Sequence, residues 1–385
     1  MSIDRRRVAI SLAAFCAFLD LYAPQAVLPL LREELDVGAG DVGLLVSATT
    51  LAIALIAPFT GAVADVLGRK RVIATAMVVL VLPTILVALA TSLPMLVLWR
   101  FVQGLLLPPV FTVTIAYIAE EFPPGEATAV TGLYISASSL GGFLGRFLTG
   151  ILAEQLGWRD AFLVLAAVTL ACAIGVAVLL PPERGFTRAA GVLSSARQML
   201  RHLTDRRLVA IYAVGFGVLF TFVATFTYVN FHLAAAPYRL SPSALGAIFA
   251  VYLMGSLVSP LTGRGVARFG RRRLVVGLIA LWAAGLALTL VPSLGAIIAG
   301  LALGVACGFV CQAVATGFVA LNAPTGRSSA IGLYATCYYL GGSAGGVLPA
   351  LAWNAAGWPG CVALLLAVLM LLAFLVELSW RDVPG

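Results

Sequence analysis

Long apolar runs follow one another along the whole chain, and short polar stretches separate them. A helix of about 20 apolar residues is long enough to cross the hydrocarbon core of a bilayer. None of the runs alternates between polar and apolar residues in segments of about ten, as the strands of a membrane barrel do. The pattern predicts about twelve spanning helices, at roughly 8–31, 42–64, 72–91, 94–119, 127–153, 159–180, 207–232, 242–263, 273–291, 294–321, 328–353 and 358–380.

The composition leaves a bilayer as the solvent for these runs. Hydrophobic residues make up 62% of the 385-residue chain, charged residues make up 10%, and the mean hydropathy is +1.06. Soluble domains carry roughly 25% charged residues. Backbone N–H and C=O groups cannot face hydrocarbon unpaired, so helices are the remaining way to cross it. We therefore expect an all-α membrane protein.

The net charge of +8 is divided unevenly between the two ends of the predicted helices. One side has the basic residues of the N-terminus, the 65–71 and 264–273 loops, the 181–206 linker, Arg327 and Arg381, whereas the other has Arg32, Arg159 and Arg239. Loops rich in Lys and Arg stay in the cytoplasm. This predicts a multi-pass protein of a bacterial inner membrane with both termini cytoplasmic. Basic clusters placed in this way argue against nucleic acid as a partner.

Several stretches recur about 200 residues apart. The basic turn Gly61–Arg71 returns in altered form as Gly263–Arg273, and Gly157-Trp158 returns as Gly357-Trp358. Repetition of this kind indicates two related halves, each of about six helices, with a transport site between them. We expect an N-terminal bundle over 1–180, a cytoplasmic linker over 181–206 and a C-terminal bundle over 207–385.

Two smaller features accompany the repeat. Glycines four residues apart let helices pack closely, as expected at Gly141 with Gly145 and at Gly342 with Gly346. The linker either contains a short amphipathic helix on the inner leaflet or is simply a mobile joint. The apolar side of such a helix would consist of Leu193, Ala196, Met199 and Leu200.

These residues resemble the major facilitator superfamily over nearly the whole chain. Gly61–Arg71 is similar to the superfamily's loop motif, and its second copy has Ala267 where the first has Asp65. Arg100-Phe101-Val102-Gln103-Gly104 is similar to the span-four motif of the drug:proton antiporter branch. Arg146 stands where that branch commonly has proline, which is similar to the YnfM-like group of bacterial efflux permeases. The resemblance implies a twelve-helix transporter.

Asp20, Arg100 and Arg146 are ionisable residues deep within predicted spans, where each costs roughly 2.5 to 3.5 kcal/mol. Burial favours the neutral form of Asp20, whereas a nearby arginine favours its carboxylate. Asp20 is therefore either a proton carrier or a static ion pair. Arg100 either assists proton movement, as the resemblance implies, or bonds backbone carbonyls. Arg146 is a partner of Asp20, a contact for an anionic substrate group, or a structural residue.

The 61–71 turn also suggests a cytoplasmic gate. Asp65 can cap a facing helix start, and Arg69 and Arg71 can pair with Glu120 or Glu121. Contacts of this kind would be broken and remade in each transport cycle. The alternative is anchoring of basic side chains at the inner leaflet. The expected gate consists of Gly61, Asp65, Gly68, Arg69, Arg71, Glu120 and Glu121.

By resemblance, spans one, four, seven and ten line a central cavity. The polar candidates for it on those spans are Tyr22, Gln25, Gln103, Asn230 and Gln312. Each can instead be a polar contact between packed helices.

We expect a secondary active transporter, not an enzyme, that exports small organic molecules by proton antiport. It would work as a monomer among membrane lipids and use no cofactor or metal. The six cysteines lie in apolar runs, and the chain has no HExxH, Gly-x-Ser-x-Gly or Walker motif. Two alternatives stay open: a sugar or metabolite exporter or uniporter without proton coupling, and a lipid or lysolipid flippase.

Overall fold

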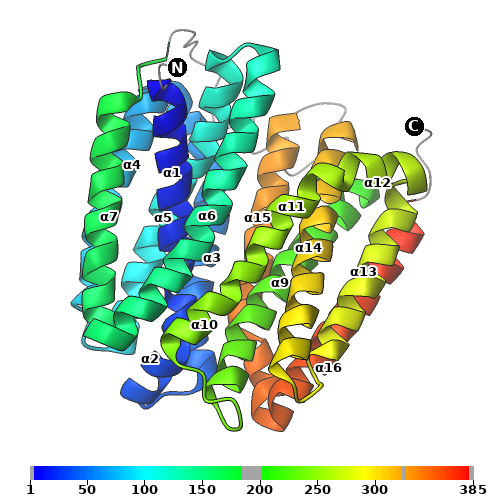
Figure 1. Ribbon diagram of the computed structural model, residues 1–385. Coiled ribbons are helices and arrows are strands. Elements are labelled where there is room, and N and C mark those ends of the chain that lie inside the picture. The colour runs from blue at the N-terminus through cyan, green and yellow to red at the C-terminus, as the bar shows by residue number, and fades with distance from the viewer. Residues whose placement is uncertain (1–3, 184–201, 323–326, 381–385) are drawn as a thin grey trace. The chain divides into compact units, whose positions relative to one another are not determined.

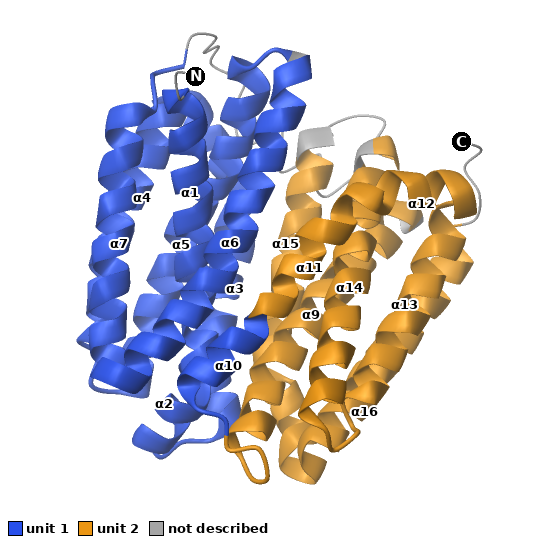
Figure 2. Ribbon diagram, in the orientation of Figure 1, with its two compact units in different colours: residues 1–192, 240–249 blue, residues 193–239, 250–385 orange. Residues whose placement is uncertain are grey.

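The computed structural model describes residues 4–183, 202–322 and 327–380, and all regular structure in those ranges is helical (Figure 1). The predicted all-α class is thereby confirmed. Two compact units are present, residues 1–192 with 240–249 and residues 193–239 with 250–385 (Figure 2). The predicted linker helix falls on residues outside the described ranges, and the predicted domain limits stay a prediction.

Unit 1 is a bundle of long helices with two short ones at its edge. Its helices are α1 (Arg5–Tyr22), α2 (Leu28–Glu34), α3 (Ala39–Leu67), α4 (Arg69–Ala88), α5 (Leu93–Glu121), α6 (Pro124–Leu156), α7 (Trp158–Leu179) and α10 (Pro242–Ile248). α1 begins at Asp4, whose side chain accepts a hydrogen bond from the backbone N–H of Arg6 at 3.0 Å. This is ordinary N-capping, which satisfies one of the unpaired amide groups of the first turn.

The first predicted span is not one straight helix. Between α1 and α2 lies a short 3₁₀ segment, η1 (Ala23–Val27), and Pro24 and Pro29 are the second residues of η1 and α2. Proline has no backbone N–H and its ring disturbs the preceding helical turn. The break therefore follows from the sequence, and it leaves carbonyl groups at the end of α1 without their usual donor.

Unit 2 repeats the long helices of unit 1. Its helices are α9 (Arg206–Ala234), α11 (Leu253–Val258), α12 (Thr262–Phe269), α13 (Arg271–Leu288), α14 (Leu294–Asn322), α15 (Arg327–Val347) and α16 (Pro349–Ser379). Ten helical segments of the described chain are long and apolar enough to cross a membrane. α13 and α15 correspond to the other two predicted spans. Three arginines at the start of α13, and many Gly, Ser and Tyr residues in α15, lower their hydropathy.

Glycines at equivalent places mark helix boundaries in both units, or, for Gly357, a kink inside α16. Gly68 and Gly270 have positive φ angles of 92° and 73°, and Gly157 and Gly357 have φ angles of 94° and 60°. Residues with a Cβ rarely adopt this backbone conformation, so glycine is required where the chain turns sharply between helices. The repeat recognised in the sequence is therefore also a repeat of backbone geometry.

In unit 1, α1 and α6 pack with almost no space between their backbones. A Cβ placed on Gly141 would lie 2.8 Å from the carbonyl carbon of Phe15, and one on Gly145 would lie 2.9 Å from Cα of Leu19. Real Cβ atoms do not approach backbone atoms so closely. The two glycines, four residues apart on one face of α6, are what allow this contact.

Unit 2 has the same arrangement between α9 and α15. A Cβ on Gly341 would lie 2.7 Å from the carbonyl carbon of Phe216, and one on Gly345 would lie 3.1 Å from Cα of Phe220. These glycines follow Gly141 and Gly145 by 200 residues. The tight contacts therefore lie one residue before the predicted pair, Gly342 and Gly346.

The eighth predicted span is divided between the units. α10 is followed by the 3₁₀ segments η2 (Phe249–Tyr252) and η3 (Ser259–Leu261), with α11 between them. α10 belongs to unit 1, where Glu154 on α6 accepts a hydrogen bond from the backbone N–H of Ser243 at 3.1 Å. A Cβ on Gly246 would lie 2.9 Å from the carbonyl oxygen of Arg146. α6 therefore holds α10 by close packing and by a cap on its first turn.

The α1–α6 contact gives a first testable prediction. Gly141→Ala places a methyl group against the backbone of Phe15, and overpacking of this kind costs about 1–3 kcal/mol. We expect a lower melting temperature in detergent for this variant. Gly132→Ala is the matched control, since it lies on the same helix with nothing within 4 Å of its Cβ position. That change should leave stability unchanged or raise it by up to about 1 kcal/mol through helix propensity. Equal melting temperatures would contradict the packing.

Candidate functional site

Asp20, on α1, lies inside unit 1 with an exposed fraction of 1%. The hydroxyl of Thr169 on α7 donates to its carboxylate at 2.9 Å, and that of Thr84 on α4 does so at 3.4 Å. The thiol of Cys16 lies at 3.7 Å. In the described part of the chain Asp20 forms no ion pair with an arginine. The carboxyl group is thus held by neutral donors.

Arg100, on α5, is buried against the broken end of α1. Its guanidinium donates to the backbone carbonyls of Asp20 at 2.9 Å, Leu21 at 2.6 Å and Leu45 at 3.2 Å. In a continuous helix the N–H of residue 24 would bond the carbonyl of Asp20, or in a 3₁₀ turn that of Leu21. Residue 24 is proline and has no N–H. Arg100 therefore supplies the donor that Pro24 lacks.

Gln103 connects Arg100 to Asp20 through side chains. Its Oε1 accepts from Nη1 of Arg100 at 2.7 Å, and its Nε2 donates to the hydroxyl oxygen of Thr84 at 2.8 Å. The same hydroxyl is the one near Asp20. Gln103 is fully buried in unit 1, so this predicted cavity residue belongs to the polar network around Asp20.

Arg146, on α6, belongs to a second buried cluster in unit 1. Its Nε donates to Oε1 of Gln25 at 2.8 Å, and Nη1 donates to the carbonyl of Gly142 at 2.7 Å. Its guanidinium carbon lies 4.2 Å from the ring centre of Tyr22 and 4.5 Å from that of Phe249. Aromatic faces stabilise a cation at these distances. Tyr22, Gln25 and Arg146, predicted separately, are therefore brought together, with Phe249 added.

Asp20, Arg100 and Arg146 lie deep enough in the predicted spans to meet, but the structure does not bring their charged groups into one cluster. Arg100 contacts the backbone carbonyl of Asp20 rather than its carboxylate, and Arg146 has the separate partners just described. The interpretation of Arg100 as an arginine bonded to backbone carbonyls agrees with these contacts.

The loop after α3 forms a compact ion-pair cluster. Nη1 of Arg69 lies 2.7 Å from the carboxylate of Asp65, and Nη2 lies 2.6 Å from that of Glu120. The Glu183 carboxylate accepts from the backbone N–H groups of Arg69 at 3.0 Å and Lys70 at 3.2 Å. It caps the start of α4, where an acid is favoured by the helix dipole.

The other predicted gate residues have different surroundings. Arg71 is exposed, and a Cβ on Gly61 would meet nothing within 4 Å. Glu183 was not expected from the sequence, since it follows α7 and lies 114 residues from Arg69. Gly68 has a positive φ angle directly before α4. Glycine adopts this conformation most readily, which explains why the motif has glycine at this position.

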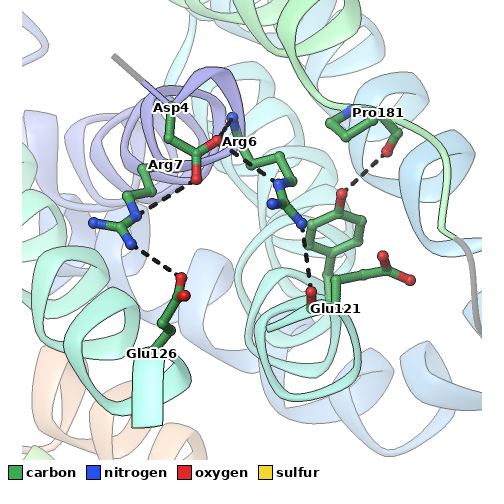
Figure 3. Close-up of polar contacts among 7 residues, drawn as sticks. Asp4, Arg6, Arg7, Glu121, Glu126 and Pro181 are labelled. Atoms are coloured by element: carbon green, nitrogen blue, oxygen red, sulfur yellow. Dashed lines mark hydrogen bonds and ion pairs between the residues drawn. The ribbon is translucent and has the colours of Figure 1, made fainter. Parts of the chain in front are cut away.

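Glu121 takes part in a second contact group at the same end of unit 1 (Figure 3). Its backbone carbonyl accepts from Nη1 of Arg6 at 3.4 Å, while Arg7 pairs with Glu126 at 3.1 Å. Both arginines also lie within 3.7 Å of the Asp4 carboxylate. These contacts tie the first turn of α1 to the connection between α5 and α6.

The predicted cavity residues of unit 2 do not line an apolar hollow found in that unit. Asn230 is buried in α9 and Gln312 is partly buried in α14. A hollow of about 730 Å³ lies between α9, α15 and α16, and neither residue lines it. Its lining is apolar apart from Tyr212 and Cys337. Such a surface suits hydrocarbon chains better than a polar solute.

Comparison with known proteins gives consistent results over the full chain. The family model described as Major Facilitator Superfamily matches residues 10–238 and 222–385. The inner membrane transport protein YnfM of Escherichia coli is 32% identical over 378 residues, covering 97% of this chain and 89% of that protein. The uncharacterized MFS-type transporter YybF of Bacillus subtilis is 30% identical over 372 residues, covering 96% and 92%.

Solved structures support the fold. A bacterial homologue of the human lysosomal transporter Spinster, inward-facing and unoccupied, has a TM-score of 0.82 at 16% identity and covers 99% of this chain and 98% of its own. The nucleoside transporter NupG has a TM-score of 0.78 at 15% identity and covers 100% of both chains. At these identities the likeness concerns the fold alone.

The backbone role of Arg100 can be tested without a transport assay. Lysine is a compact point charge and cannot reach all the acceptors of the guanidinium, and each unsatisfied buried group costs about 1–3 kcal/mol. We expect Arg100→Lys to lower the melting temperature clearly. Arg159→Lys is the control, because its pair with Glu34 at 2.5 Å is exposed and exposed pairs contribute at most about 1 kcal/mol. If the two variants were equally stable, Arg100 would not replace the missing donor of Pro24.

Proposed function

The chain belongs to the major facilitator superfamily, and from this premise we propose that it exports small organic molecules by proton antiport. It is a multi-pass membrane transporter, and its relatives are transporters rather than enzymes. Transporters of this family handle small-molecule substrates. Proton coupling, the outward direction and operation as a monomer belong to the proposal.

The observation that supports proton coupling most directly is the environment of Asp20. Its carboxyl group is buried in a membrane-spanning helix and contacts hydroxyls of α4 and α7. A hydroxyl can donate to a carboxylate and can accept from a carboxylic acid. Both protonation states therefore find partners without repacking, as a group that takes up and releases a proton requires. A fixed ion pair with arginine would favour the carboxylate alone.

Arg146 supports a substrate-binding role in the same unit. Its guanidinium lies over the rings of Tyr22 and Phe249 and is bonded to Gln25. Aromatic rings and a cation side by side suit a flat organic molecule that carries an acidic group. We assign Tyr22, Gln25 and Arg146 to substrate contact. Asn230 and Gln312 are proposed as substrate contacts of unit 2.

The ion-pair cluster of the 61–71 turn is proposed as the gate on the cytoplasmic side. The distribution of basic residues supports that orientation, and the relative in E. coli is named an inner membrane protein. We accordingly place the chain in a bacterial inner membrane with both termini inside. Asp65, Arg69 and Glu120 form the charged part of the gate, Gly68 permits the turn, and Gly61, Arg71 and Glu121 border it.

Proton coupling is tested with Asp20→Asn in proteoliposomes that contain a trapped pH dye. A panel of small organic compounds is added to the wild type first, and a compound that moves protons is then used throughout. Asparagine can hydrogen-bond Thr169 but cannot release a proton, so we expect compound-driven proton flux to fall at least about tenfold. Exchange of the compound between equal concentrations should persist.

Asp160→Asn is the matched control, since Asp160 is exposed in the first turn of α7, and its flux should equal that of the wild type. Compound uptake without proton flux in the wild type would overturn antiport in favour of a uniporter. Movement of a fluorescent lysolipid, with no compound transported, would favour a flippase.

The gate is tested by Glu120→Gln. This removes the negative charge of a side chain that accepts two hydrogen bonds from Arg69, one of them from Nε at 3.0 Å. Hydrogen bonds to charged groups contribute about 1.5–3 kcal/mol, so the balance between closed and open gate should shift about tenfold or more. We expect slower transport with an unchanged amount of folded protein. Glu126→Gln removes an exposed pair with Arg7 and should change the rate less than about threefold. Similar rates for both variants would contradict the gate.

A further inference from the structure

Five arginines lie within ten residues of unit 2, on α12 and in the first turn of α13. They are Arg264, Arg268, Arg271, Arg272 and Arg273. Arg264, Arg268 and Arg273 are exposed, and the other two are partly exposed. We call this set the α12 arginine cluster. It is the second copy of the loop that contains Arg69 in unit 1.

The two copies differ in their acidic partners. In unit 1, Arg69 pairs with Asp65 and Glu120, and its backbone N–H bonds Glu183. In unit 2 the position equivalent to Asp65 is Ala267, and α14 ends in Ala-Leu-Asn where α5 ends in Ala-Glu-Glu. The positive charge of the loop was retained in the second copy, but the built-in acids were not.

The described residues offer the α12 arginine cluster little neutralising charge. Arg272 lies 3.3 Å from the carboxylate of Glu377, and Arg271 lies 5.6 Å from the ring centre of Phe318. In the described ranges the other four arginines form no ion pair. The parts of the chain that the structure does not describe contain one acidic residue, Asp382. A surplus of several positive charges therefore stays at this surface.

Exposed apolar side chains lie beside the cluster. Phe269 is 53% exposed at the end of α12, with the Arg268 guanidinium 5.3 Å from its ring centre, and Leu261 is 52% exposed just before α12. Arg264 and Arg268 are four residues apart and share one face of the helix. Apolar groups next to exposed arginines are typical of a segment that lies at the boundary between headgroups and acyl chains.

The direction of α12 fits this location. In unit 1, α3 continues as one helix to Leu67, whereas the equivalent stretch of unit 2 is interrupted at η3, which contains Pro260. After this break α12 runs across the end of unit 2 at a steep angle to α13 and α14 (Figure 1). Its arginines are therefore spread along the membrane surface rather than stacked along a spanning helix.

We propose that the α12 arginine cluster binds the phosphate headgroup of an anionic phospholipid, with Phe269 and Leu261 against its acyl chains. Guanidinium groups bond phosphate oxygens in a bidentate manner. Each basic residue near an anionic surface strengthens binding about fivefold. The cluster thus differs from its copy in unit 1, whose acids satisfy its arginine within the protein.

The test measures binding of dioctanoyl phosphatidylglycerol to the detergent-solubilised full chain by thermophoresis. We expect phosphatidylglycerol to bind at least about tenfold more tightly than dioctanoyl phosphatidylcholine, and added salt to weaken the binding. Arg264→Gln with Arg268→Gln should weaken it about 30-fold. Arg264→Lys with Arg268→Lys keeps the charge but loses the bidentate geometry, so it should weaken the binding measurably and by less than the glutamine pair does.

The control variant is Arg5→Gln with Arg207→Gln, which removes the same charge from two exposed arginines at other helix starts. Equal loss in this control would reduce the effect to net charge and overturn the site. Equal binding of the two lipids would also overturn it, as would full competition by millimolar inorganic phosphate, which would indicate a site for free phosphate. If the glutamine pair fails to fold, the lipid preference and salt dependence of the wild type, together with the lysine pair, still decide the question.

Discussion

The missing amide hydrogen of Pro24 is the constraint on which the interior of unit 1 depends. Water cannot replace a lost donor inside hydrocarbon, so the carbonyls at the end of α1 need another one. Arg100 supplies it to Asp20 and Leu21 and still has donors for Leu45 and Gln103. A buried cation is costly, but here it is surrounded by oriented carbonyl dipoles. The buried arginine of the fourth span therefore compensates for the break in the first span, because it donates to the carbonyls at the end of α1.

The contacts of Arg100 determine which partners remain for the carboxyl group of Asp20. Because the guanidinium is committed to backbone oxygens, the carboxyl group retains the hydroxyls of Thr84 and Thr169 as partners. Among the described residues, Gln103 and Thr84 connect the Arg100 guanidinium to the Asp20 carboxyl group through side-chain hydrogen bonds. Helices α1, α4, α5 and α7 are thereby joined by hydrogen bonds around a buried carboxyl group that forms no ion pair in the described part of the chain.

The sequence indicated the spans, the repeat and the costly residues, because hydropathy, glycine spacing and buried charge are local properties. The partners of those residues could not be found in the same way. Thr84 and Thr169 are small polar residues in apolar runs, with nothing to distinguish them from others. Phe249 follows a helix that belongs to unit 1 although it lies late in the chain, and Glu183 caps a helix 114 residues before it. Such contacts depend on packing between helices distant in sequence.

The internal repeat separates backbone requirements from side-chain chemistry. Gly68 and Gly270 both hold positive φ angles, so the sharp turn before α4 and before α13 was kept in both copies. The acids that neutralise the first turn were not kept in the second. A backbone feature shared by both copies belongs to the fold, whereas a charge found in one copy reflects what that surface contacts. For Arg69 the contacts are carboxylates of its own unit, and for the α12 arginine cluster the proposed contact is the phosphate of an anionic phospholipid.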